Sequence, residues 1–317
     1  MKRQVQLLVA VAAAGAMAAS AFAASGQFTS WSPAVRVEAT GADPEFNGAA
    51  LDGCPFISKD GTTFYMASNR TGGLGGIDIW VSTRASEDDP WGAPVNAGAP
   101  VNSEFNDFCP TISRDGHRFY FVSNRPGGCG GDDIYTTRLR PHGWDPVQNI
   151  GCEANSPANE ASPFPLPDNG GGPVLYFSSN RPGGFTSEAP GAASGDADLY
   201  VSEWHGGAFA TAELVPGASS AAEDGQPNLR RDGLELFFFS TRPGTLGMAD
   251  IYSATRAKKS DPWSTPVNLG PNVNSKDGAE TRPSLAWDGT TLYFGSTRPG
   301  GEGMADHYVT TREPAGN

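Results

Sequence analysis

The sequence has little positive charge. Its 22 Lys and Arg are outnumbered by 35 Asp and Glu, and the formal net charge at pH 7 is −13. Nucleic acids and anionic membranes are held by dense clusters of Lys and Arg. The composition therefore excludes both as partners. It favours a soluble chain, or one with a basic or cationic partner.

Sustained helical periodicity and long apolar runs are also missing. The one apolar stretch, Val5–Ala19, is shorter than the roughly 20 residues that span a membrane. It lies between Lys2-Arg3 and the small-x-small sequence Ala21-Phe22-Ala23, which predicts a signal peptide over residues 1–23. We expect an exported protein, periplasmic or secreted, with no transmembrane segment after cleavage. An uncleaved N-terminal anchor is the alternative.

Catalytic and metal-binding signatures are absent as well. There is no Gly-x-Ser-x-Gly, no His-Glu-x-x-His and no phosphate-binding loop in the sequence. The histidines lack the spacing of zinc ligands; they are His117, His142, His205 and His307. Because these motifs are absent, we predict no catalytic residue and no dedicated metal site.

Glycine and proline are abundant, at 41 and 26 residues, and many fall in a motif that occurs five times. The second copy reads Ser123-Asn124-Arg125-Pro126-Gly127-Gly128 and continues to Asp133-Ile134-Tyr135. An aromatic, β-branched run precedes it, and an Asp-Gly pair, a strong hairpin signal, precedes that run. The other copies begin at Ser68, Ser179, Ser240 and Ser296.

Each repeat therefore predicts four short antiparallel strands, and the chain an all-β, five-bladed β-propeller. Its blades cover about 51–102, 106–157, 160–220, 224–275 and 280–312. The last blade lacks a fourth strand, which residues 28–38 supply, so that the ring closes without unpaired edges. Residues 24–317 then form a single domain. The third Gly-rich loop carries an insertion, Phe185–Gly195.

The repeat resembles a known family. The pattern Pro-x-x-Ser-x-Asp-Gly, then Tyr-Phe-x-Ser-Asn-Arg-Pro-Gly-Gly, then Asp-Ile-Tyr is similar to the PD40 repeat, a WD40-like, TolB-type β-propeller repeat of exported bacterial proteins. The resemblance spans about residues 28–312. It implies the fold and export, and it says little about function.

An acidic residue lies three positions before the Pro that opens each first strand. By the pseudo-symmetry of the repeats, we expect these five carboxylates to form a ring at the mouth of the central channel, with Arg282 as an internal counter-charge. The ring consists of Asp52, Asp107, Glu160, Asp224 and Glu280. It could bind a divalent cation such as calcium, or a basic group of a partner; the alternative is a structural role within each blade. Unpaired, such carboxylates would repel one another and raise their pKa values.

The Arg and Asp of the repeated motif stand eight residues apart in four of the five copies, as in Arg125 and Asp133. We expect them to form an ion pair that holds the Gly-rich loop. His307 replaces the aliphatic residue that follows this Asp in the other copies, and we expect it to pack in a partly exposed position.

Four cysteines in an exported chain indicate two disulfides, for which three pairings are possible. Cys54 and Cys109 occupy equivalent positions in neighbouring blades. Cys129 and Cys152 both lie on the face of the Gly-rich loops. We favour Cys129–Cys152 and Cys54–Cys109.

Uniform blades without a catalytic motif predict a non-catalytic, monomeric binding module for a protein or cell-envelope component, without a cofactor. The alternative is a carbohydrate-active enzyme, of the glycoside hydrolase type, that uses two carboxylates at the channel mouth. Such chemistry needs two carboxyl groups with different pKa values.

Overall fold

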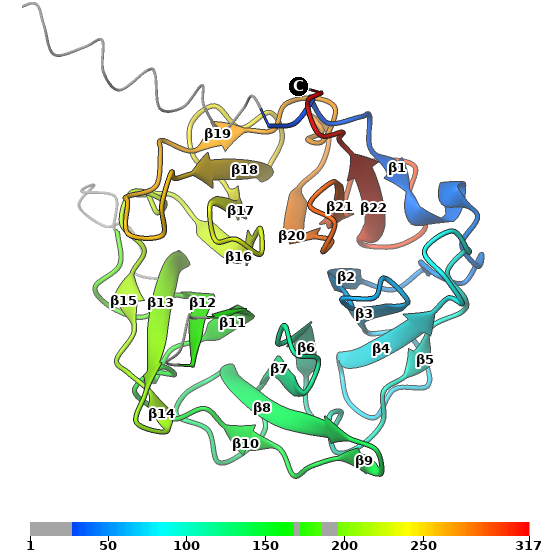
Figure 1. Cartoon of the computed structure of the whole chain (residues 1–317). Coiled ribbons are helices and arrows are strands. Elements are labelled where there is room, and N and C mark those ends of the chain that lie inside the picture. The colour runs from blue at the N-terminus through cyan, green and yellow to red at the C-terminus, as the bar shows by residue number, and fades with distance from the viewer. Residues whose placement is uncertain (1–26, 168–171, 186–195, 317) are drawn as a thin grey trace, which may run out of the picture.

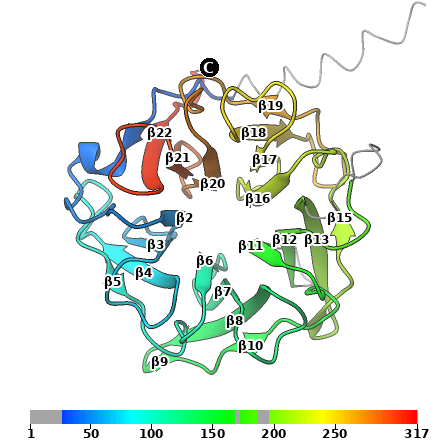
Figure 2. The ribbon, with the colours of Figure 1, turned by 180° about the vertical axis from the view of Figure 1, so that it is seen from behind.

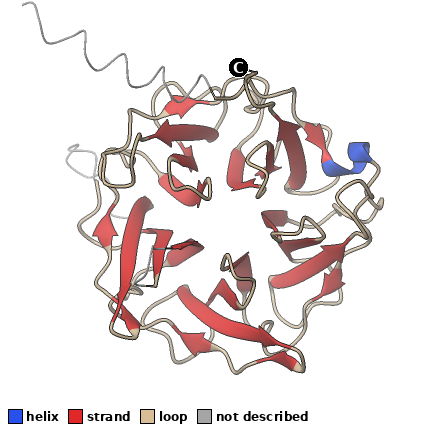
Figure 3. Cartoon of the chain, in the orientation of Figure 1, coloured by secondary structure: helices blue, strands red, loops and turns tan. Residues whose placement is uncertain are grey.

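The computed structural model describes residues 27–167, 172–185 and 196–316. The predicted signal peptide lies outside the described residues, as do residues 186–195 of the blade 3 insertion. Among the described residues, no helix is long and apolar enough to cross a membrane. One short 3-10 helix, η1 (Val37–Thr40), is the only helix in this part of the chain (Figure 3).

Five antiparallel sheets surround one central axis, and the predicted five-bladed β-propeller is confirmed (Figures 1 and 2). Blade 1 contains β2 (Asp52–Ile57), β3 (Thr63–Ser68), β4 (Asp78–Thr83) and β5 (Val95–Asn96). Blade 2 contains β6 (Asp107–Ile112), β7 (Arg118–Ser123), β8 (Asp133–Arg140), β9 (Gly143–Trp144) and β10 (Gln148–Asn149). Blade 3 contains β11 (Glu160–Pro167), β12 (Pro173–Ser179), β13 (Asp198–His205), β14 (Ala208–Phe209) and β15 (Glu213–Leu214).

Blade 4 contains β16 (Asp224–Leu229), β17 (Glu235–Ser240), β18 (Asp250–Thr255) and β19 (Val267–Asn268). Blade 5 contains β20 (Glu280–Leu285), β21 (Thr291–Ser296) and β22 (Asp306–Thr311). Its fourth strand is β1 (Val35–Arg36), from the N-terminal segment, in which Val35 pairs with Val309. The predicted closure of the ring is thus confirmed. The first strands β2, β6, β11, β16 and β20 lie nearest the axis (Figure 1).

Aromatic and aliphatic side chains of the second strands form the layers between blades. Phe64, Phe119, Leu175, Leu236 and Leu292 occupy equivalent positions on these strands and are all at most 1% exposed. Each blade therefore buries its apolar surface against its neighbours, as expected when one repeat is too small to form its own core.

The two faces of the disc carry different loops. In blades 1, 2, 4 and 5, hairpin turns with Asp-Gly join the first and second strands, and the Gly-rich loops join the second and third at the other end. Gly61, Gly116, Gly233 and Gly289 adopt positive φ in these hairpin turns, which explains the glycine after the aspartate. We call the two sides the turn face and the loop face.

Candidate functional site

The five ring acids begin the inner strands, and each is completely buried. Their partner is an arginine of the same blade, the one in the Gly-rich loop. The distances are 2.7 Å for Asp52–Arg70, 2.6 Å for Asp107–Arg125, 3.0 Å for Glu160–Arg181, 2.6 Å for Asp224–Arg242 and 3.1 Å for Glu280–Arg298. Each carboxylate is thus neutralised inside its own blade.

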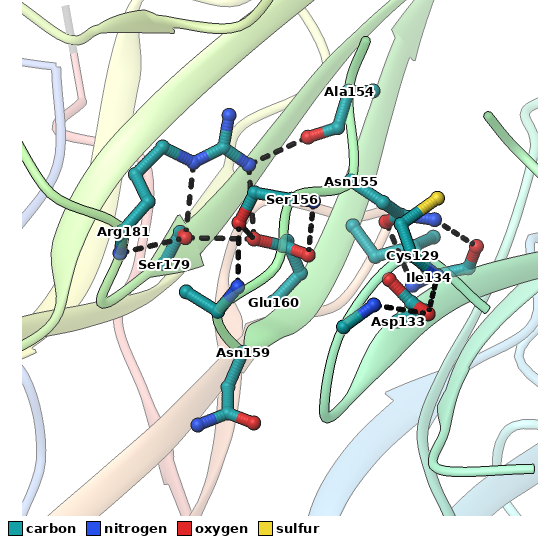
Figure 4. Close-up of polar contacts among 12 residues, drawn as sticks. Cys129, Asp133, Ile134, Ala154, Asn155, Ser156, Asn159, Glu160, Ser179 and Arg181 are labelled. Carbon is teal, nitrogen blue, oxygen red and sulfur yellow. Dashed lines mark hydrogen bonds and ion pairs between the residues drawn. The ribbon is translucent and has the colours of Figure 1, made fainter. Parts of the chain in front are cut away.

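Further hydrogen bonds tie each ring acid to the loop that enters its blade. In blade 3, Glu160 accepts bonds from Ser156 and Ser179, while Arg181 also donates to the carbonyl of Ala154 (Figure 4). Similar sets recur in the other four blades, as at Asp107 with Ser103. The predicted repulsion within the ring is therefore largely relieved by arginine, although burial raises the pKa of Glu280.

The predicted pairing of each loop Arg with the Asp eight residues later is wrong. Those aspartates instead accept backbone N–H bonds from the Gly-rich loop, as Asp133 does from Cys129 at 2.6 Å (Figure 4). A side chain on Gly128 would collide with the same carboxylate. The glycine is needed because the loop backbone closes around Asp133.

The residue before each opening Pro points into the central channel, and all five adopt a left-handed backbone with φ between 48° and 58°. They are Cys54, Cys109, Ser162, Gln226 and Arg282. The channel holds only about 40 Å³, which is room for a few water molecules. None of the five ring acids lines it.

Both predicted disulfides are confirmed, as Cys54–Cys109 and Cys129–Cys152. Cys54–Cys109 occupies two of the five positions around the channel. Arg282 occupies a third and packs against Gly53. The prediction that Arg282 neutralises the ring is wrong, because it pairs with no carboxylate among the described residues, and burial lowers its pKa.

His307 is fully buried, so the predicted partly exposed position is wrong. It follows Asp306 in β22, where the other blades place Ile79, Ile134, Leu199 and Ile251. The Asn47 side-chain oxygen accepts a bond from its backbone N–H at 2.7 Å and lies 3.0 Å from Nδ1. Burial lowers the pKa of His307 to about 4.

Replacing His307 with Ile, as in blades 1, 2 and 4, is expected to remove part of the acid sensitivity of folding. A histidine in the unfolded chain titrates near pH 6.5, so protonation favours unfolding between that pH and about 4. The wild type should lose about 2 kcal/mol by this route on going from pH 8 to pH 5. Urea unfolding of both proteins at the two pH values measures the difference. The exposed His205, changed to Gln, is the control, and an unchanged pH dependence in His307→Ile contradicts the assignment.

A second set of carboxylates, not predicted, lies on the loop face at the junction of blades 3 and 4. The backbone N–H of Asp224 donates to the carbonyl of Ala197 at 2.8 Å, which brings the preceding residues, Glu223 and Asp196, close together. Glu223 is half-buried and Asp196 is exposed. Burial raises the pKa of Glu223, and the charges of Asp196 and Asp224 raise it further.

The sequence did not indicate this pair, because neither residue belongs to a recognised motif and the two come together only through the contact between blades 3 and 4. The residue before the ring acid is Leu51, Asn106, Asn159, Glu223 or Ala279 in the successive blades. Blade 4 alone has an acid there. An alignment of the repeats that looked for differences would have found it.

No protein-family model and no curated protein matches the sequence. The PD40 resemblance therefore stays a prediction beyond the propeller fold itself. Solved structures do match. The catalytic domain of the Coprinopsis cinerea GH62 α-L-arabinofuranosidase is 13% identical, with a TM-score of 0.56, over 90% of this chain and 98% of that one.

An α-L-arabinofuranosidase from Lactobacillus brevis gives 13% identity and a TM-score of 0.55 over 88% and 94% of the two chains. A protein from Agrobacterium tumefaciens described as TolB gives 16% identity and a TM-score of 0.50 over 87% and 80%. At such identities the likeness establishes the fold.

The prediction of a non-catalytic, TolB-like binding module is contradicted by these comparisons. The similar structures are mostly glycoside hydrolases, from families GH43 and GH62, and TolB appears beside them as one match. The alternative prediction, a carbohydrate-active enzyme, is the better supported of the two.

Proposed function

We propose that the protein is an exported carbohydrate-active enzyme that hydrolyses glycosidic bonds of a polysaccharide. The observation that carries the proposal is the Glu223–Asp196 pair on the loop face. It combines a half-buried carboxyl group of raised pKa with an exposed carboxylate beside it. The similar arabinofuranosidases add support for the substrate class.

Glycosidases need one carboxyl group that keeps its proton and one that does not. Glu223, with its raised pKa, is suited to protonate the oxygen of the leaving sugar. Asp196, exposed to solvent, is suited to act as the second carboxyl group, either on a water molecule or directly on the sugar. The buried ring acids are unsuited to both roles, because arginine, serine and backbone N–H groups occupy their oxygens.

A panel of arabinan, arabinoxylan, pectin and bacterial envelope glycan tests the proposal through the release of reducing sugar. We expect turnover of at least one polymer, and a loss of about 100-fold in Glu223→Gln, the low end of what a general acid contributes. NMR of the first product shows whether the anomeric configuration is kept or inverted.

Asp132→Asn is the matched control. Asp132 is also a partly buried loop-face acid whose pKa is raised by burial, but it lies at the junction of blades 2 and 3. Its variant should keep full turnover. Intact protein that releases no sugar from any polymer, or Glu223→Gln with unchanged turnover, removes the proposed function.

A further inference from the structure

Three grooves between neighbouring blades open at equivalent places around the disc. They lie at the junctions of blades 5 and 1, blades 3 and 4, and blades 2 and 3. The residue six positions after the third-strand Asp contributes to each groove from the later blade. This residue is Arg84 in the groove between blades 5 and 1, and Arg256 in the groove between blades 3 and 4. In the groove between blades 2 and 3, which we call the 2/3 groove, it is Trp204.

In the grooves of Arg84 and Arg256, the arginine contacts residues of its own blade. Arg84 and Arg256 each stack on a Trp of the same blade, Trp91 and Trp263, at 4.2 Å from the ring centroid. Their Nε atoms donate to the carbonyls of the turn glycines at 2.7 and 2.8 Å. These guanidinium groups are therefore already occupied by structural contacts.

The 2/3 groove has the opposite arrangement, because its arginines come from the earlier blade. Arg118 and Arg138 are directly opposite each other on β7 and β8. The same cross-strand pair is Thr63–Thr83 in blade 1 and Thr291–Thr311 in blade 5. Like charges at such positions destabilise a sheet, and neither arginine has a carboxylate partner among the described residues.

Further charges lie on the same rim. Lys59 and Arg114, from the turns of blades 1 and 2, also line the 2/3 groove, and no carboxylate of the described chain pairs with them. Asp115, the one acid in the lining among the described residues, is hydrogen-bonded to Ser113 in its own turn. The groove is thus strongly positive in a chain whose net charge is −13.

The floor of the groove contains an unused hydrogen-bonding group. Tyr120 is completely buried, and its hydroxyl has no hydrogen-bond partner among the described residues. At the equivalent place in the groove between blades 3 and 4, the hydroxyl of Tyr176 accepts a bond from Arg256 at 3.4 Å. Trp204 replaces that arginine in the 2/3 groove, and Arg118 of blade 2 lies near the Tyr120 hydroxyl instead, so the two groups can contact one ligand together.

We propose that the 2/3 groove binds an acidic saccharide, with a uronic acid unit inside it. The groove has a volume of about 750 Å³, within the range of small-molecule sites. Arg118 and Arg138 offer planar donor pairs that match a carboxylate. Trp204, over which the Arg118 guanidinium lies at 5.4 Å from the ring centroid, forms an aromatic wall of the groove that a sugar can pack against, and the Tyr120 hydroxyl lies at its floor.

That the ligand is anionic follows from the positive charge of the groove alone. That it is a sugar rests on the proposed function. The catalytic pair and the groove are on opposite faces, so the two can be tested separately. Glu223→Gln serves as the background for binding experiments, since it leaves the groove intact and prevents loss of ligand by turnover.

Calorimetry of Glu223→Gln with tri-galacturonic acid, a neutral galactose trisaccharide and sodium acetate tests the proposal. We expect the acidic trisaccharide to bind at least about 10-fold more tightly than either of the others, with an affinity that falls as salt rises. Arg138→Thr, which restores the residue of blades 1, 4 and 5, should weaken binding about 10- to 100-fold. It should also raise the melting temperature slightly, because it removes the repulsion from Arg118.

Arg140→Thr is the matched control. Arg140 lies two residues further along β8, is exposed and pairs with Asp145 outside the groove. Its variant should bind as tightly as the background protein. The inference is overturned if the acidic trisaccharide binds no more tightly than the neutral trisaccharide or acetate. It is also overturned if a nucleoside monophosphate binds more tightly than the acidic trisaccharide, or if Arg138→Thr leaves the affinity unchanged. Binding without turnover by the wild type would remove the proposed function only.

Discussion

Arg125→Met is expected to lower the free energy of unfolding by about 3–5 kcal/mol. The Arg125 guanidinium donates to Asp107 at 2.6 Å, to the carbonyl of Val101 at 2.6 Å and to the hydroxyl of Ser123 at 2.9 Å. Methionine fills much of the same volume but leaves the fully buried Asp107 carboxyl without its arginine. The cost is large because a buried charge has lost its counter-charge.

Urea unfolding at pH 7 measures this change. Arg140→Met, which breaks the exposed pair with Asp145, is the comparison and should cost less than about 1 kcal/mol. Adding Asp107→Asn to Arg125→Met should recover part of the stability, since the orphaned charge is then removed. If the free energy of unfolding of Arg125→Met falls by less than about 1 kcal/mol, the ion pairs of the ring acids do not stabilise the blades.

The same experiment bears on the predicted cation site of the ring. If the ring acids are structural and fully paired with arginine, neither calcium nor a chelator should shift the midpoint of the unfolding curve. A ring that holds calcium is stabilised by the ion, because a ligand of the folded state shifts the equilibrium by mass action. A midpoint that rises with calcium would favour the ring as a binding site.

The fold could be predicted from the sequence because the same strand and turn pattern occurs five times. Any single Asp-Gly turn is weak evidence, but four of them, in blades 1, 2, 4 and 5, fit a closed ring when the spare N-terminal strand supplies the fourth strand that blade 5 lacks. The partners within a blade could not be predicted in the same way. The loop arginine, Arg125 in blade 2, has the same spacing to the ring acid and to the later Asp in four of the five blades. Only the backbone geometry of the Gly-rich loop decides which of the two carboxylates it meets.

The candidate sites were missed for the opposite reason. Uniform positions, such as the ring acids, are what a repeated structural role produces, whereas Glu223, Arg138 and Trp204 break the repeat. Their importance depends on contacts between neighbouring blades, which bring together residues that are well separated in the sequence. Trp204 and Arg118 meet across two blades, and the unpartnered hydroxyl of Tyr120 becomes evident only when Tyr176 and its Arg256 are compared with it.

Arg312→Met is expected to lower the free energy of unfolding by about 2–3 kcal/mol by opening the closure of the ring. The loss is smaller than in Arg125→Met because Glu235 keeps its ion pair with Arg230 at 3.2 Å. Arg312 of blade 5 forms a two-pronged ion pair with Glu235 of blade 4, with both distances 2.7 Å and both side chains under 10% exposed. Its guanidinium also lies over the rings of Phe28 and Trp31, at 3.8 and 4.5 Å from their centroids. One side chain therefore joins blade 4, blade 5 and the N-terminal segment.

Arg84→Met is the matched control, since Arg84 holds the same position in blade 1. It stacks on Trp91 and donates to the carbonyl of Gly61, but it has no carboxylate partner among the described residues. Its loss should cost about 1 kcal/mol. In Arg312→Met the amides of β1 should also exchange faster than those of β2, because the N-terminal strand has lost its anchor while blade 1 has not. Equal losses in the two variants, with unchanged exchange in β1, would show that the pairing of β1 with β22 closes the ring without the arginine.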